Sequence, residues 1–260
     1  MATLPNAPLV EAWFQLRWGK VKKGSSGSQE FEMPIEDTDF FPGQFREVAV
    51  TEGFSCVERI NPHVRIPIPH VITYRFRRAE NDWPCYQIGL GIFTVNQVNE
   101  GYEWKKFKED VLKGLTILNK GHPLGLEKLN TMGVQLQYRD GFVFNEGEEP
   151  LGFLSKNFTI GFMPPGEFLA FDSIKNDMTG IRIAFNLTTV HPEGSLVLEI
   201  QQGTINAQPG IIMDMIVRSS DDQMPSLQPE SISNWLEESH KIQRHAFRTL
   251  INPAFARTFQ

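Results

Sequence analysis

Hydrophobic and polar positions follow the most regular pattern between His70 and Leu118. Ile72, Tyr74 and Phe76 share one face of a predicted strand and polar residues share the other, as in a half-buried strand. Strands at 85–90 and 92–95 follow. The spacing then becomes helical, and a single apolar stripe is formed by Trp104, Phe107, Val111, Leu115 and Leu118. An antiparallel meander followed by one covering helix predicts an α+β unit.

A second stretch, from Gly180 to Leu250, repeats this order. Apolar residues alternate over 181–187, the segment 191–194 predicts a turn, and 196–200 and 211–217 predict two more strands. Pro229 is at a position that suits the first residue of a helix. The helical stripe that follows consists of Ile232, Trp235, Leu236, Ile242, Ala246, Phe247 and Leu250. On this helix Glu237 and Lys241 are predicted to form an ordinary i,i+4 pair.

Each stretch is preceded by a strand and a short helix. The first strand is predicted at Leu9–Trp18 with a helix at 42–50, and the second at Leu129–Phe144 with a helix at 150–157. Asp140-Gly141 indicates a turn within the second strand. Residues 19–29, rich in Gly, Ser and Lys, indicate an exposed loop.

The shared order predicts an internal duplication of a strand–helix–antiparallel meander–long helix unit. We therefore expect an α+β protein of two helix-grip-like lobes, an N-terminal lobe at 1–124 and a C-terminal pseudo-repeat at 125–260. Each lobe is expected to have a long helix clamped on its own sheet.

The composition narrows the classes of function. The chain has 260 residues, a formal net charge of −6 and only two cysteines. An acidic chain lacks the overall basic character typical of nucleic-acid binders, so nucleic acid is an unlikely partner. No apolar run approaches the roughly 20 residues that cross a bilayer. The start of the chain has no signal-peptide pattern, so we expect a cytoplasmic protein without membrane partners.

The N-terminal sequence Leu4-Pro5-Asn6-Ala7-Pro8-Leu9-Val10-Glu11-Ala12 carries a resemblance. Together with Tyr86-Gln87-Ile88-Gly89, Trp104 with Phe107, and Trp235-Leu236 near His240, it resembles a sporadically distributed bacterial and archaeal family of proteins of about this length. The resemblance covers nearly the whole chain. That family has no settled activity and no catalytic residues to transfer. Such genes often travel with defence or mobile-element loci, so the resemblance implies a regulatory or partner-binding role, such as antiviral defence.

No catalytic or metal-binding motif stands out. His240 and His245 are five residues apart on a predicted helix, whereas a helical chelate uses residues three or four apart. Cys56 and Cys85 have neither a CxxC pattern nor a neighbouring histidine. There is no Walker, GxSxG or HExxH pattern. We therefore expect no cofactor, no metal and no enzymatic activity.

Aromatic residues are the candidates for binding. Trp13 is predicted on the polar face of the first strand, and Trp18, Phe40 and Phe41 lie nearby in the sequence. An exposed aromatic stripe would mark a contact surface. The function predicted first is a non-enzymatic protein-binding accessory or regulatory factor whose partner is another protein, and a homodimer stays open. The alternative is a small-ligand-binding protein or hydrolase with a pocket between sheet and helix.

Overall fold

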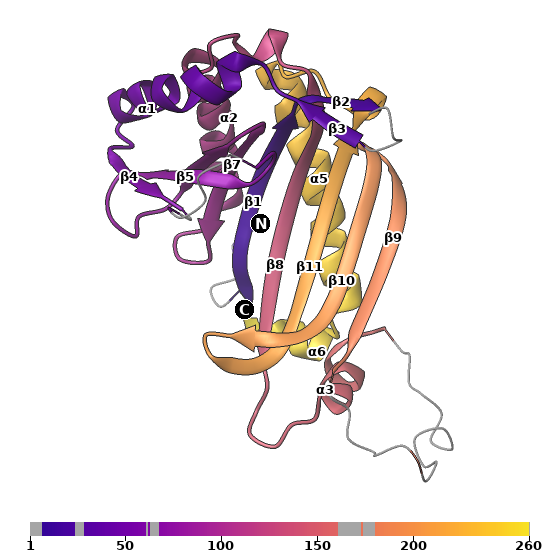
Figure 1. Cartoon of the computed structure of the whole chain (residues 1–260). Coiled ribbons are helices and arrows are strands. Elements are labelled where there is room, and N and C mark those ends of the chain that lie inside the picture. The colour runs from indigo at the N-terminus through magenta and orange to yellow at the C-terminus, as the bar shows by residue number, and fades with distance from the viewer. Residues whose placement is uncertain are drawn as a thin grey trace.

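The chain folds as an α+β protein around one antiparallel sheet of nine strands (Figure 1). A computed structural model describes residues 7–23, 29–60, 62, 68–160, 173 and 180–259. The strand order is β4-β5-β6-β7-β1-β8-β11-β10-β9. In chain order the strands are β1 Leu9–Trp18, β4 Cys56–Arg59, β5 Ile72–Arg77, β6 Cys85–Gly89, β7 Ile92–Val98, β8 Thr131–Val143, β9 Arg182–Val190, β10 Glu193–Ile205 and β11 Gln208–Ser220.

The pair β1·β8 forms the centre of the sheet and joins the two halves of the chain. Phe14 lies opposite Leu136 across this pair, and β1 is paired on its other side with β7. From the centre outward the order is β1, β7, β6, β5 on one side and β8, β11, β10, β9 on the other. In each half, therefore, the last strand before the long helix returns to pair with the first. The sheet is continuous across the predicted boundary at residue 124, so the expectation that each half has a sheet of its own is wrong.

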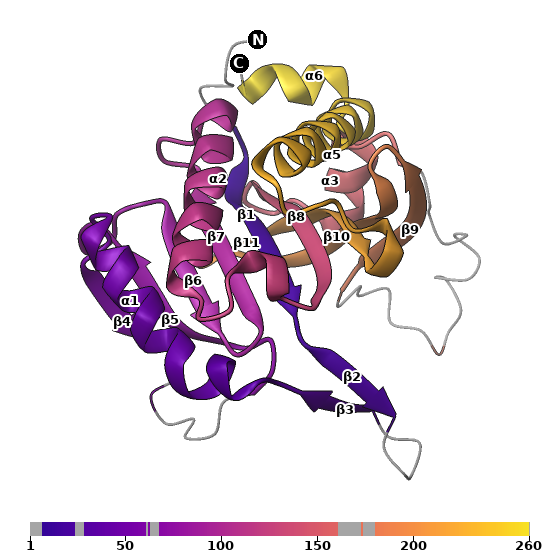
Figure 2. The ribbon, with the colours of Figure 1, turned by 90° about the horizontal axis from the view of Figure 1, so that it is seen from above.

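Two long helices, α2 Trp104–Gly121 and α5 Pro229–Leu250, cover the same face of the sheet (Figure 2). A Cβ on Gly114 of α2 would lie 2.9 Å from the Phe93 ring on β7, so glycine allows this helix to approach its strands closely. On α5, Trp235 contacts Phe14 edge to face with ring centroids 6.5 Å apart. Residues that share this face of the sheet are buried because their alternation in sequence matches the strand period.

Shorter elements complete the fold. Helix α1 Phe41–Thr51 packs on α2, and α3 Pro150–Asn157 follows β8. A two-stranded ribbon, β2 Lys20–Lys23 with β3 Gln29–Glu32, projects from the end of β1 (Figure 2). Within the described residues, the other elements are the π-turn η1 Glu36–Phe40, the 3-10 turns η2 Leu126–Lys128, η3 Asp221–Gln223 and η4 Arg257–Phe259, and α6 Pro253–Ala256.

A buried polar knot ties η1 to β1 and to the end of α2. The Trp18 indole donates to Asp37 Oδ1 at 2.7 Å, and His122 Nε2 lies 2.8 Å from the same oxygen. The backbone N–H of Leu124 donates to His122 Nδ1, so Nε2 carries the proton and donates to Asp37. The side chains of Asp37 and His122 have no exposed surface.

Most predicted elements agree with the structure, and two turn or loop predictions are wrong. Asp140 and Gly141 do not form a turn, because β8 continues through both to Val143 and pairs there with β11. The stretch 19–29 is not a plain loop, because Lys20–Lys23 and Gln29–Glu32 pair as strands. Two stretches of the N-terminal part lie outside the described residues. They are 1–6, which include Leu4–Asn6 of the N-terminal sequence, and 24–28.

Candidate functional site

The four aromatic residues predicted to bind do not form one surface. Trp18 and Phe41 are buried, with at most 1% of either side chain exposed, and they contact one another in the core. Phe40 is 52% exposed at the end of η1. Trp13 is half-buried on the face of β1 that points away from α2 and α5. Only Trp13 and Phe40 can therefore be reached from solvent.

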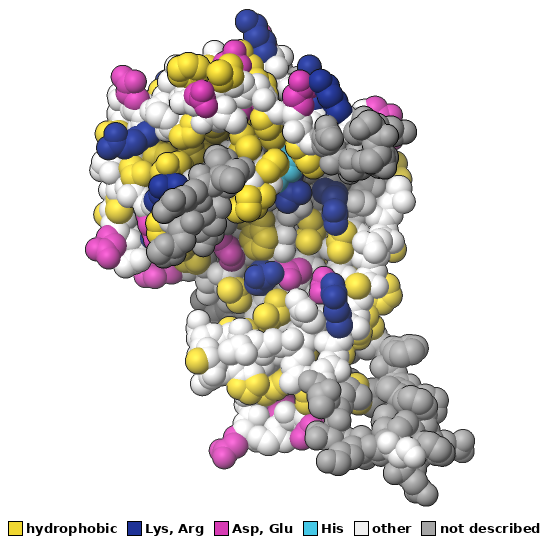
Figure 3. Space-filling model, viewed as in Figure 1, with side chains coloured by type: hydrophobic (Ala, Val, Ile, Leu, Met, Phe, Trp, Pro, Cys, Tyr) yellow, Lys and Arg dark blue, Asp and Glu magenta, His cyan; other side chains and the backbone are white. Residues whose placement is uncertain are grey.

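Trp13 belongs to the face of the sheet that no described helix covers, which we call the open face. In Figure 3, Lys and Arg side chains alternate with Asp and Glu across it. On the central strands it comprises Glu11, Trp13, Gln15, Arg17, Gln135, Gln137, Arg139, Val197, Glu199, Ile212, Asp214, Ile216 and Arg218. It therefore combines a few apolar side chains with many polar and charged ones, as contact surfaces between proteins often do.

The centre of the open face is held by a network of charged groups. The Arg139 guanidinium binds Asp214 through two hydrogen bonds of 2.9 and 3.0 Å, and Gln137 donates to the same carboxylate at 2.9 Å. The Arg139 guanidinium carbon lies 5.6 Å from the centre of the Trp13 ring, a cation–π contact. Glu11 accepts from Asn96 at 2.7 Å. These contacts restrict the Trp13 neighbourhood, so a partner would meet an ordered surface.

A second polar cluster lies on the opposite face, between α2, α5 and β8, and we call it the seam cluster. The hydroxyls of Tyr102 and Tyr138 are 2.5 Å apart, and the Tyr138 hydroxyl lies 2.8 Å from His240 Nδ1. The His240 ring stacks on Trp104 with centroids 4.0 Å apart. A continuous hydrogen-bonded chain thus links the start of α2, the sheet and the middle of α5.

The exposed end of the seam cluster joins the two long helices through Glu237. Its two carboxylate oxygens accept from Lys108 Nζ at 2.5 Å and from the Trp104 indole at 3.2 Å. The predicted pair of Glu237 with Lys241 is therefore wrong. Lys241 instead binds Glu238 at 2.6 Å. Glu237 turns toward α2 because that helix offers it two donors.

Burial shifts the ionisation of the seam cluster and of Asp140, which lies two residues after Tyr138 on the same face of β8. Removal from water raises the pKa of Asp140 to about 7, and the negative charge of Asp214 adds to the effect. Burial also lowers the pKa of His240 to about 4, against the opposing attraction of Glu237. The pKa values of Tyr102 and Tyr138 are both raised by burial. At neutral pH the imidazole and both phenols are therefore uncharged.

These shifts resemble those of active sites, yet the arrangement suits a structural role better. His240 already binds Tyr138, and Asp140 is almost fully buried, with its Oδ2 left without a hydrogen bond. None of the cluster lines the groove described next. The hydrogen bonds among Tyr102, Tyr138 and His240 instead hold α2 and α5 to the sheet.

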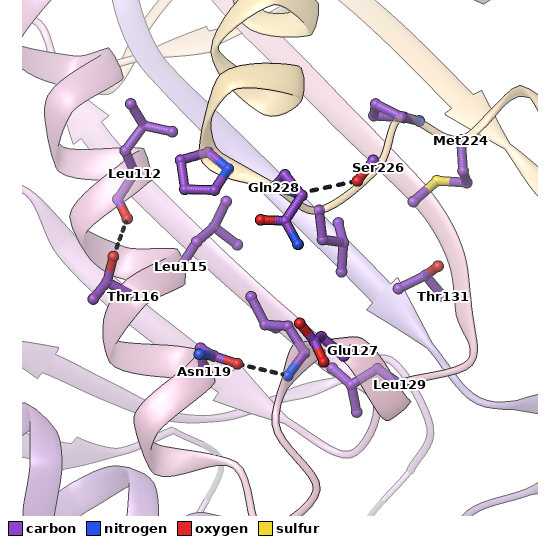
Figure 4. A pocket seen from close by; sticks show the side chains of 14 residues that line it. Leu112, Leu115, Thr116, Asn119, Glu127, Leu129, Thr131, Met224, Ser226 and Gln228 are labelled. Atoms are coloured by element: carbon purple, nitrogen blue, oxygen red, sulfur yellow. Dashed lines mark hydrogen bonds between the residues drawn. The ribbon is translucent and has the colours of Figure 1, made fainter.

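A groove of about 720 Å³ opens between the second half of α2 and the segment that leads into α5 (Figure 4). Its lining consists of Leu112, Leu115, Thr116, Asn119, Leu126, Glu127, Leu129, Thr131 and residues 224–229. Several polar groups are already engaged, since Asn119 accepts from the backbone N–H of Leu126 and Thr116 donates to the carbonyl of Leu112. It lies between α2 and two loops, not between the sheet and a helix as the alternative function expected.

The residues weighed for metal binding are not brought together. Within the described ranges, no group of three or more His, Cys, Asp or Glu side chains could hold a metal ion. Cys56 and Cys85 are both free thiols, and Cys85 is buried. Among the described helices, none is both long and apolar enough to cross a membrane.

The seam cluster and the two buried polar side chains beneath α5, Asp140 and Gln243, were not predicted, although the sequence carries a signal for buried polar groups there. Asp140 falls on the same face of β8 as Leu136 and Tyr138, and Gln243 interrupts the apolar stripe of α5. Gln243 is fully buried and donates to the carbonyls of Leu136 and Met215 at 2.9 and 2.8 Å. A polar side chain at a position that the period assigns to the core indicates a buried hydrogen-bond network.

Comparisons with protein-family models, with curated proteins and with solved structures found no match.

Replacing Tyr138 by Phe should lower the free energy of unfolding by about 1–3 kcal/mol, because it leaves the Tyr102 hydroxyl and His240 Nδ1 without their shared partner. Urea unfolding at pH 7 measures the change. Tyr74→Phe is the matched control, since the half-buried Tyr74 side chain makes no hydrogen bond to any described residue, and it should change stability by less than about 0.5 kcal/mol. Equal effects of the two variants would contradict a linking role for Tyr138.

Proposed function

We propose that this chain is a non-enzymatic accessory or regulatory factor that holds another protein against its open face. The observation that carries the proposal is the asymmetry of the sheet. One face is covered by α2 and α5, while no described helix lies over the other, where Trp13 is half-buried beside Arg139. An ordered sheet face with an aromatic residue at its centre and charges around it suits a protein partner.

The resemblance supports the same proposal from a different direction. Genes of the family that this chain resembles often travel with defence or mobile-element loci, which favours a regulatory or partner-binding role. On this basis we propose a cytoplasmic role in a prokaryotic, antiviral defence system. The partner is expected to contact Trp13 on β1 and the apolar side chains of Ile212 and Ile216 on β11, the strand on the other side of β8.

A photo-crosslinking amino acid at position 13 tests the proposed surface in cells of the native host. We expect one host protein to be captured in stoichiometric amount from position 13. The control is the same amino acid at Lys105, which is exposed on α2 and points away from the sheet. Capture of the same protein from both positions, or of none from position 13, would overturn the proposal.

The groove favours a small-ligand-binding protein as a second candidate. Its volume of about 720 Å³ and its leucine-rich wall suit a small amphipathic molecule. This function leaves the open face without a role. In that case a small amphipathic molecule should bind in the groove, and the photo-crosslinking amino acid at position 13 should capture no protein.

We also propose that the two halves arose by duplication, with units at 1–124 and 125–260. The mirrored strand order about β1·β8 supports this, as does the position of a short helix after the first strand of each half. Each long helix packs mainly on strands of its own half, α2 on β7 and α5 on β8 and β11.

A further inference from the structure

Two arginines on the open face differ from the others. Each of Arg75, Arg77, Arg139 and Arg182 lies within 4 Å of a carboxylate on a neighbouring strand, at distances of 3.2, 3.9, 2.9 and 2.7 Å. Arg17 and Arg218 are exposed, and in the described part of the chain neither has a carboxylate within that distance. The charge pairing that organises this face is therefore missing at these two positions.

The strand register places the two arginines near one another on the same face of the sheet. Arg17 lies opposite Gly133 and Gly133 opposite Ser220, while Gln135 of the adjacent row lies opposite Arg218. Arg17 and Arg218 are therefore diagonal neighbours across β8, with their side chains on one face. Burial lowers the pKa of Arg17, and the positive charge of Arg218 lowers it further. The two guanidinium groups are therefore close enough to repel one another.

On β8, the residue in the same row as Arg17 is Gly133, which has no side chain. A Cβ there would meet Ser219 O at 3.5 Å and Ser220 Cβ at 3.9 Å, which are ordinary contacts, so the backbone would accept alanine. Glycine therefore places no side chain on β8 at the row of Arg17, between that residue on β1 and Arg218 on β11. We call the site formed by Arg17, Gly133, Arg218 and Ser220 the arginine notch.

The Arg17 side chain of the arginine notch is held in one orientation by Gln15. With its amide oxygen turned toward Arg17, Gln15 accepts from Arg17 Nε at 2.7 Å and from Nη2 at 3.1 Å. This leaves the remaining nitrogen of the Arg17 guanidinium, the Arg218 guanidinium and the Ser220 hydroxyl as donors around the notch. Because a fixed guanidinium loses little further freedom on binding, it is a good oxyanion receptor.

We infer that the arginine notch binds one phosphate monoester, carried on a serine or threonine side chain of the partner protein. A phosphate monoester has a charge of about −1.5 to −2 at pH 7 and matches two guanidinium groups, whereas a single carboxylate matches one. The inference rests on the proposed protein-binding function and names the chemistry of its partner.

The rest of the open face favours a single phosphate over a nucleic acid. Asp214, Glu199 and Glu11 lie on the same face, and the whole chain has a net charge of −6. A polyanion that extended beyond the notch would meet these carboxylates. A phosphorylated side chain presents its charge at one point and avoids them.

Titration of the full chain with O-phospho-L-serine, followed in ¹H–¹⁵N spectra that include the arginine Nε signals, tests the inference. We expect the signals of Arg17 and Arg218 to shift, with binding that strengthens as pH rises through about 6, where the phosphate loses its second proton. Glutarate should bind at least about fivefold more weakly and show no such pH dependence, since its carboxylates are already ionised.

Variants decide whether the notch is the site. Arg17→Gln and Arg218→Gln should each weaken phosphoserine binding about tenfold, since each removes a charge-assisted contact. Arg182→Gln, on the same face but paired with Glu199, should change it less than about twofold. Gly133→Ala should also weaken binding, because it adds a methyl group on β8 between the two arginines.

Three results would overturn the inference: equal binding of glutarate and phosphoserine, an unchanged affinity in the Arg17→Gln/Arg218→Gln double variant, or tighter binding of a 20-nucleotide single-stranded DNA than of phosphoserine. The outcome is separable from that of the proposed function. Capture of a host protein at position 13 together with failure of phosphoserine to bind would reject the arginine notch alone.

Discussion

Replacing Asp37 by Ala is expected to lower the free energy of unfolding by about 3–5 kcal/mol. The Asp37 carboxylate accepts from both the Trp18 indole and His122 Nε2, and all three side chains lie in the core. Alanine would leave two buried N–H donors without an acceptor, and the cost of such donors exceeds the net gain from an ordinary hydrogen bond. Urea or thermal unfolding at neutral pH measures the loss.

Asp39→Ala is the matched control for this variant. Asp39 belongs to the same π-turn but is exposed, so its removal should change stability by less than about 0.5 kcal/mol. Near-ultraviolet circular dichroism of Trp18 should also change in the Asp37 variant, because the indole loses its fixed partner. A loss below about 1 kcal/mol would show that water replaces the carboxylate and that the knot is not needed for stability.

Replacing Asp140 by Asn should remove a pH-dependent destabilisation that reaches about 4 kcal/mol above pH 8. The pKa of Asp140 is raised from 3.8 to about 7 by burial. Between these values the unfolded chain has released the proton while the folded chain retains it. Stability from this group is therefore complete below pH 3.8 and is lost as pH rises toward 7.

His240 acts in the opposite direction over part of the same range. Its pKa is lowered from 6.5 to about 4, so its contribution is complete above pH 6.5 and is lost as pH falls toward 4. In the native chain the two effects partly cancel between pH 4 and 6.5. In the Asn variant only the histidine effect remains, so stability should rise with pH in that window.

Urea unfolding of both proteins at pH 4.5, 6 and 8 tests this directly. The difference between variant and native chain should grow with pH, and the slope is more informative than any single value because asparagine adds an amide donor of its own. Asp222→Asn, an exposed carboxylate in η3, is the control and should give a constant difference. Parallel pH profiles for the Asp140 variant would mean that Asp140 is ionised in the folded chain at neutral pH.

Local periodicity predicted the elements of this fold well. The strand Leu9–Trp18 and the helices at Pro150–Asn157 and Pro229–Leu250 have the expected bounds, because one face of each is apolar and proline opens both helices. The continuous sheet could not be predicted in this way. Pairing of β1 with β8 depends on contacts between residues more than a hundred positions apart, and the alternation within each strand says nothing about its partner.

The candidate sites were harder to predict for the same reason. Trp18 and Phe41 are buried against one another and against His122, and no local pattern predicts that β1, α1 and the end of α2 meet there. Arg17 and Arg218 are two hundred residues apart in the sequence and become neighbours only through the register of β8 with β1 and β11. By contrast, a polar residue such as Asp140 on an otherwise apolar strand face indicates a buried polar group. The interpretation of Asp140-Gly141 as a turn led away from it.

The central position of β1·β8 has a consequence for synthesis of the chain on the ribosome. Until residues 131–143 emerge, β1 has only β7 as a neighbour, and its other backbone edge is open. An unpaired edge of this length is a template for joining a second nascent chain. Polysomes that translate this message, or products truncated near residue 124, therefore carry the risk of strand exchange between copies, which ends once β8 has been made.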